Sequence, residues 1–169
     1  LESHYQRDES AFCLSYVLTF SRSEECTLGY SLLAYPQFGA LSGGVCSEFV
    51  QYTNEKGEET ERHSLNTGAV TMRKPSSRLG HRVPIRQSQL ALAHEFGHSL
   101  GAEHDEDTED IEEEHLMSHG ARLYEYKNKS KFSRQSIEQI SAVLDALESY
   151  EPYDPTGKTV HRIKKNCLQ

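Results

Sequence analysis

Hydrophobic and polar residues alternate along one short stretch of the chain, from Leu14 to Phe20. A period of two is typical of strands that bury one face, so we predict a strand there. We predict another strand from Gly68 to Met72. Between them, the polar and charged residues from Tyr52 to Arg62, centred on Gly57, predict an exposed hairpin or loop.

Two later segments have the spacing of helices. One spans about Arg86 to Leu100, and the other begins at a capping Ser133 and runs to about Tyr150. The order is strand, strand, long loop, strand, helix, acidic loop, helix and tail, which predicts an α/β (α+β) fold. The second helix carries an apolar stripe that we expect in the core: Ile137, Ile140, Val143, Leu144 and Leu147.

The first predicted helix contains two histidines that can share a metal ion. His94 and His98 are four residues apart, so their imidazoles lie on one face of the helix, and Glu95 is beside them. His104 follows after Gly101, a residue that lets the chain end a helix and turn back. The pattern predicts a Zn²⁺ site with three histidine ligands.

This ligand set also predicts chemistry. Three neutral imidazoles leave Zn²⁺ with an open position for a water molecule, whose pKa falls to roughly 7. Glu95 is then the candidate general base that takes a proton from this water during attack on a peptide carbonyl. A bare pair of histidines on a helix also fits an ordinary amphipathic helix, but the added Gly101 and His104 favour the zinc site.

Asp105 directly follows the third histidine, and with it the chain resembles the metzincin zinc endopeptidases, in their ADAM/adamalysin (reprolysin) branch. The resemblance is greatest to the sheddase pair of tumour-necrosis-factor-converting enzyme and α-secretase (Kuzbanian). It extends from about Ala11 to about Leu147. The motifs that carry it are Phe12-Cys13-Leu14-Ser15-Tyr16, Thr27-Leu28-Gly29-Tyr30, Gly43-Gly44-Val45-Cys46, Ser64-Leu65-Asn66-Thr67-Gly68, Leu116-Met117-Ser118 and Lys131-Phe132-Ser133.

The resemblance implies a metzincin-type catalytic domain with a twisted mixed sheet, an active-site helix and a Met-turn. Such a domain would cleave extracellular or membrane-protein substrates, as in ectodomain shedding. By resemblance Asp105 is a structural anchor and Met117 an apolar floor under the metal, although Met117 alone fits ordinary core packing. Leu28 and Gly29 are expected on an edge strand that pairs with the substrate. The pocket for the side chain after the scissile bond is expected at Ser118, His119, Gly120 and Ala121.

The composition of the chain limits the classes of molecule that it is expected to bind. The chain has 169 residues, 36% of them hydrophobic, which suffices for one core, and its net charge of −8 argues against nucleic acid. No apolar run is long enough to span a membrane or to act as a signal peptide. Nine of the twelve residues from Glu103 to Glu114 are acidic, which is typical of a solvated loop. The alternative interpretation of these acidic residues is a Ca²⁺ site, although the carboxylates lack a regular ligand spacing.

Four cysteines in a chain that resembles extracellular proteases predict disulfides. The resemblance implies that Cys46 pairs with Cys167, which would tie the tail of residues 151–169 to the domain. The resemblance offers no partner for Cys13 within this chain. Cys26 could take the place of that partner.

In the family that the chain resembles, the catalytic domain begins with additional strands and a helix, whereas this chain begins near the position of the third strand. We therefore expect residues 1–169 to be a single catalytic domain that is N-terminally incomplete. Its location is expected to be extracellular, either secreted or as the ectodomain of a membrane-anchored parent. Two functions remain open, a zinc endopeptidase and a catalytically inactive, truncated binding module. The intact histidines and Glu95 favour the enzyme.

Overall fold

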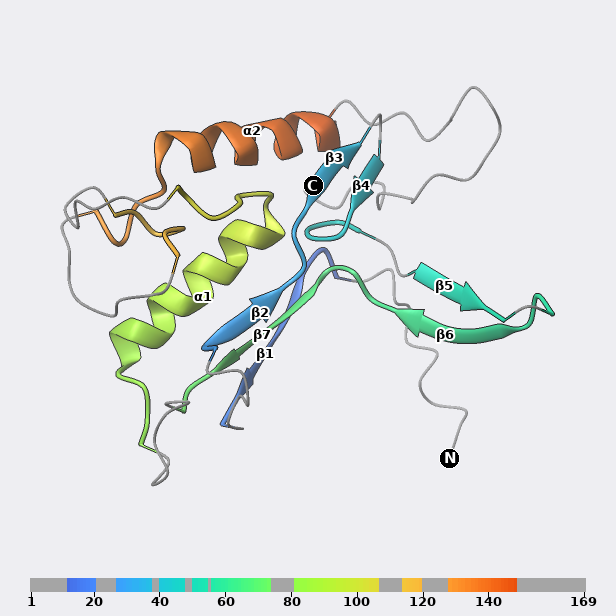
Figure 1. Cartoon of the computed structure of the whole chain (residues 1–169), viewed down its shortest axis with the longest axis horizontal. Coiled ribbons are helices and arrows are strands. Elements are labelled where there is room, and N and C mark those ends of the chain that lie inside the picture. The colour runs from blue at the N-terminus through green and yellow to red at the C-terminus, as the bar shows by residue number, and fades with distance from the viewer. Residues whose placement is uncertain are drawn as a thin grey trace.

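Three strands form the central sheet. The computed structural model of the chain describes residues 12–20, 27–37, 40–47, 50–54, 56–73, 81–106, 114–119 and 128–148. Within them β1 (Ser15–Thr19), β2 (Gly29–Ser31) and β7 (Thr67–Thr71) pair in the order β1-β7-β2 (Figure 1). Strand β7 is parallel to β1 and antiparallel to β2. The sheet is therefore mixed, and the two predicted strands are confirmed to within one residue at each end.

Two hairpins extend from this sheet. Strands β3 (Tyr35–Gln37) and β4 (Ala40–Ser42) form one, and β5 (Val50–Thr53) and β6 (Glu59–His63) form the other. The second confirms the predicted hairpin and points away from the rest of the fold in Figure 1. Gly57 turns it with a φ of +78°, which favours glycine. The β3–β4 hairpin was not predicted, because three-residue strands are too short to show a periodic pattern.

Two helices cover the strands. Helix α1 (Ile85–Ser99) packs against β2 and β7, and α2 (Arg134–Glu148) contacts β3 and β4 (Figure 1). Ser133 caps α2, because its Oγ accepts a hydrogen bond of 3.1 Å from the Ser136 N–H. Neither helix is long and apolar enough to cross a membrane. Both predicted helices are confirmed; α2 is described as far as Glu148, and the expected end near Tyr150 lies outside the described residues.

The buried hydrophobic residues of the described chain form two clusters. The predicted stripe of α2 contributes Val143, which is fully buried, and the partly buried Ile140 and Leu147. Ile137 was expected in the core but is 54% exposed. It lies roughly 90° around the helix from the centre of the other three residues, so it falls outside the buried face. The buried members are Ala34, Val45, Cys46 and Val143 in one cluster and Ala102, Leu116 and Met117 in the other.

The structure tests the predicted disulfide bonding only in part. Cys46 is disulfide-bonded, and Cys26, the alternative partner of Cys13, lies outside the described residues. Cys167 lies outside the described residues together with the whole tail of residues 151–169. Its pairing with Cys46 therefore stays a prediction.

Candidate active site

The end of α1 turns the chain towards the third histidine. The Gly101 N–H donates to the His98 carbonyl at 2.8 Å, and the Ala102 N–H donates to the Gly97 carbonyl at 2.9 Å. This pair of bonds is a Schellman motif, which needs a left-handed residue, and Gly101 has a φ of +99°. The turn predicted from Gly101 is present, and it brings His104 back towards the helix.

The three imidazoles converge on one point. His94 Nε2 lies 3.1 Å from His98 Nε2, and His104 Nε2 lies 3.2 Å from both. Three nitrogens bound to Zn²⁺ at about 2.05 Å in tetrahedral geometry are about 3.3 Å apart. Within the described residues, this is the only group of histidine, cysteine or acidic side chains that brings three ligand atoms together in this way.

Backbone carbonyls orient two of these rings. His94 Nδ1 lies 2.7 Å from the Leu116 carbonyl oxygen, and His98 Nδ1 lies 2.7 Å from the Ala102 carbonyl oxygen. A carbonyl oxygen can only accept, so each Nδ1 carries the hydrogen and each Nε2 presents a lone pair. Lone pairs at 3.1 Å repel one another unless a cation lies between them. The donor set therefore fits Zn²⁺.

The surroundings keep the rings in the form that binds metal. Burial, helped by the nearby His94, lowers the pKa of His98 to about 4. Burial and the neighbouring His119 also lower the pKa of His104. Both rings are therefore neutral at neutral pH, and only neutral imidazole can bind a metal.

The Met-turn lies under this site. Met117 is fully buried, and a Cβ added to Gly97 of α1 would lie 2.4 Å from its Sδ. The Asp105 N–H donates to the Met117 carbonyl at 3.0 Å. The Asp105 carboxylate in turn accepts hydrogen bonds from the hydroxyls of Ser133 and Ser136 at the start of α2. The segment after His104 is thus hydrogen-bonded both to Met117 and to the start of α2, and the anchoring role of Asp105 stays a prediction.

The candidate general base is buried beside the histidines. Glu95 is 7% exposed, and its Oε2 accepts a hydrogen bond of 2.6 Å from the Ser31 hydroxyl. Burial raises the pKa of this carboxyl, whereas the hydrogen bond from Ser31 and the charge of His94 oppose the rise. Burial also raises the pKa of Tyr16, against hydrogen bonds with Ser99 and Ser31.

The predicted substrate strand lies against this carboxylate. Gly29 begins β2, Leu28 immediately precedes it, and β2 forms one edge of the three-stranded sheet within the described residues. A Cβ on Gly29 would lie 2.5 Å from both Cγ and Oε1 of Glu95. The edge position is therefore as expected, and the absence of a side chain at Gly29 makes room for the Glu95 carboxylate.

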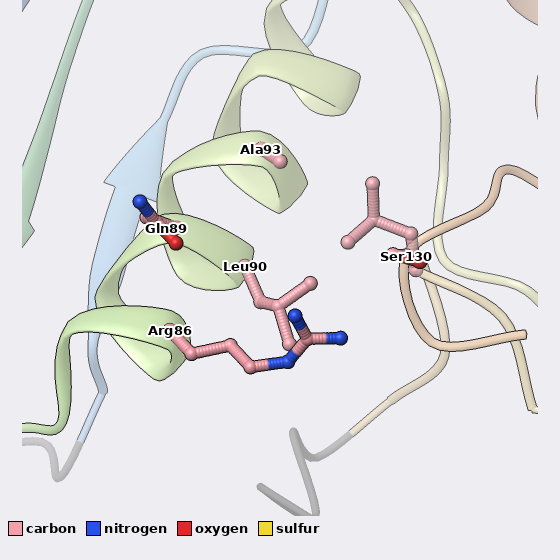
Figure 2. A pocket seen from close by; sticks show the side chains of 6 residues that line it. Arg86, Gln89, Leu90, Ala93 and Ser130 are labelled. Carbon is pink, nitrogen blue, oxygen red and sulfur yellow. The ribbon is translucent and has the colours of Figure 1, made fainter. Parts of the chain in front are cut away.

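A cavity of about 250 Å³ opens next to the first histidine. Leu90 and Ala93 of α1 face the segment that carries Ser130, and the Arg86 side chain extends from the first turn of α1 (Figure 2). Leu116, whose carbonyl contacts His94, completes the loop side. This lining does not include Ser118 or His119, and Gly120 and Ala121 lie outside the described residues, so their binding role stays a prediction.

Two further histidines and the acidic loop lie nearby. The His119 ring is exposed and stacks on His104 with ring centroids 3.9 Å apart. His115 is half-buried and its N–H donates to the Ser118 hydroxyl. Residues 107–113 of the acidic loop lie outside the described residues, so the alternative of a calcium site is untested.

Sequence reasoning missed the residues that surround the ligands. Ser31 is two positions after Gly29, so period-two alternation places both side chains on the same face of β2. Leu90 is four positions before His94, which places it on the ligand face of α1. Both spacings can be read from the sequence. The spacing of Ser31 becomes informative only when β2 is known to pack against α1, and the spacing of Leu90 only when Leu116 is known to do so.

Comparisons with known proteins give the family of this chain. Residues 3–146 match the family described as Metallo-peptidase family M12B Reprolysin-like. The chain is 41% identical over 175 residues to a disintegrin and metalloproteinase domain-containing protein 10 homolog of Caenorhabditis elegans, covering 100% of the chain and 18% of that protein. It is 31% identical over 156 residues to disintegrin and metalloproteinase domain-containing protein 10 of Homo sapiens, covering 86% of the chain and 19% of that protein.

A more distant relative belongs to the same group. The chain is 26% identical over 147 residues to a disintegrin and metalloproteinase domain-containing protein 17 homolog of Caenorhabditis elegans, covering 79% of the chain and 21% of that protein. The chain thus spans about a fifth of the length of these relatives. The predicted branch and fold are confirmed, and the chain belongs to the reprolysin-like M12B family of zinc metallopeptidases, in its ADAM branch.

Proposed function

We propose that this chain is a zinc endopeptidase that cleaves extracellular or membrane-protein substrates, as in ectodomain shedding, with Glu95 as its general base. The observation that carries the proposal is a buried carboxylate that follows the first of three convergent imidazoles and lies against an edge strand. The disulfide at Cys46 supports an extracellular location, secreted or as part of a membrane-anchored parent, because disulfides persist in oxidising compartments.

The residues divide the chemical work between them. His94, His98 and His104 would hold Zn²⁺, which would act as a Lewis acid that polarises the scissile carbonyl and lowers the pKa of water. Glu95 accepts a proton from the attacking water on a carboxylate oxygen and then delivers it to the nitrogen of the leaving amine.

The substrate would lie extended along β2. Backbone hydrogen bonds at Leu28 and Gly29 would align it, and the cavity beside His94 would receive the side chain that follows the scissile bond. The walls formed by Leu90, Ala93 and Leu116 are apolar, so we expect a preference for an apolar side chain at this position.

Turnover of a quenched fluorescent peptide tests this function. The peptide carries an apolar residue after the scissile bond, and the chain is assayed with and without a chelator. We expect chelator-sensitive cleavage in the wild type and none in Glu95→Ala, which should still bind one zinc ion. Equal turnover in the wild type and Glu95→Ala would remove Glu95 as the base. Bound zinc without any cleavage in the wild type would instead favour the inactive binding module.

A further inference from the structure

Ser31 makes the shortest described hydrogen bond to the catalytic carboxylate that is proposed above. Its Oγ lies 2.6 Å from Glu95 Oε2 and 3.0 Å from the Glu95 carbonyl oxygen. A serine hydroxyl has one hydrogen to donate, and a bond to a carboxylate is shorter and stronger than a bond to a neutral carbonyl. The carboxylate is therefore the main acceptor of this hydroxyl.

Ser31 lies on the face of β2 that meets the helix carrying Glu95. Gly29 and Ser31 are on the same face of β2, the face that meets α1, whereas Tyr30 between them is 64% exposed. Gly29 leaves room for the carboxylate on the Oε1 side, and Ser31 holds its Oε2. A single edge strand thus aligns the substrate and fixes the base beneath it.

We infer that Ser31 is a positioning residue, which holds the Glu95 carboxylate in the orientation that proton transfer requires. This inference rests on the proposed function of Glu95 as the general base. A carboxylate with no such partner can rotate about its side-chain torsions, so only a fraction of molecules would have an oxygen aimed at the attacking water. Ser31 would remove that freedom, and its described hydrogen bonds join it to Glu95 and Tyr16.

The first experiment measures kcat and KM separately on the quenched peptide. Ser31→Ala should lower kcat about ten- to hundredfold, the effect of losing a hydrogen bond to a charged group, with KM within about threefold. Ser31→Thr keeps the hydroxyl and should restore most of kcat. Ser88→Ala is the matched control, because Ser88 is a buried serine of α1 whose hydroxyl contacts only the Pro84 carbonyl among the contacts described for it. An unchanged kcat in Ser31→Ala, or a rise in KM alone, would overturn the inference.

The second experiment does not depend on turnover. Urea unfolding of the wild type, Ser31→Ala, Glu95→Ala and the double variant forms a double-mutant cycle. We expect Ser31→Ala to lower the urea midpoint in the wild type and to change it much less when Glu95 is already alanine. Additive shifts would show that the two side chains do not interact, and would overturn the inference whatever the turnover. A wild type that binds zinc but does not cleave would refute the proposed function, and the cycle would then decide on Ser31 by itself.

Discussion

Replacing Gly101 by alanine tests how the third histidine is delivered. The new Cβ would lie 2.4 Å from Val143 Cγ2, whereas two carbons are comfortable at about 3.5–4.0 Å. Relieving this overlap requires more than about 1 Å of movement in a packed core, at a cost of roughly 1–3 kcal/mol. The φ of +99° costs a residue with a side chain roughly another 1–3 kcal/mol. We therefore expect a loss of about 2–6 kcal/mol of stability, a large part of the roughly 5–15 kcal/mol of a domain.

Gly57→Ala is the matched control for the backbone cost. Gly57 has a φ of +78°, but a Cβ there would meet no atom within 4 Å. Both variants should be less stable than the wild type in urea unfolding. The urea midpoint of Gly101→Ala should be lower than that of Gly57→Ala by roughly 1 M. Adding Val143→Ala to Gly101→Ala should recover part of the difference, because it removes the methyl group that overlaps. Equal midpoints for the two glycine variants would refute the packing argument.

Three further outcomes follow from the contacts around the site. Gly29→Ala places a Cβ 2.5 Å from the Glu95 carboxylate, so kcat should fall at least about tenfold while zinc stays bound; turnover within twofold of the wild type would contradict this. Asp105→Ala removes the acceptor of the Ser133 hydroxyl and should cost roughly 1–3 kcal/mol in urea unfolding and weaken zinc binding; an unchanged zinc affinity would argue against the anchor. Removal of metal by a chelator should lower the Tm, since zinc at a thousand times its Kd contributes about 4.1 kcal/mol, and His98→Ala should show no such shift.

The convergence of the three candidate zinc ligands could be predicted because its information is local. The spacing of His94 and His98 follows from the helical repeat, and Gly101 marks the end of the helix. The same holds for β1, whose alternating pattern is long enough to be recognised. The resemblance carried by Asp105 and the Met-turn then provided the fold class, which no periodic pattern could have provided alone.

The rest of the site depends on contacts between distant segments. The hydrogen bond from Ser31 to Glu95 joins residues 64 positions apart, and the contact of His94 with the Leu116 carbonyl spans 22 positions. Neither pair has a spacing rule that would identify it before the strands and loops are packed. Ile137 shows the same limit in the core, because its place at the margin of the apolar stripe left its burial to the neighbouring elements.

Zinc titration of the metal-free chain is the most direct test of the central claim, that three imidazoles and Glu95 form a peptidase site. Turnover of the quenched peptide is followed as zinc is added, with Glu95→Ala titrated in parallel. The account predicts that wild-type turnover rises with zinc and stops rising at one ion per chain, and that Glu95→Ala binds the same zinc without cleaving. Cleavage that does not depend on zinc, or that persists in Glu95→Ala, would contradict it.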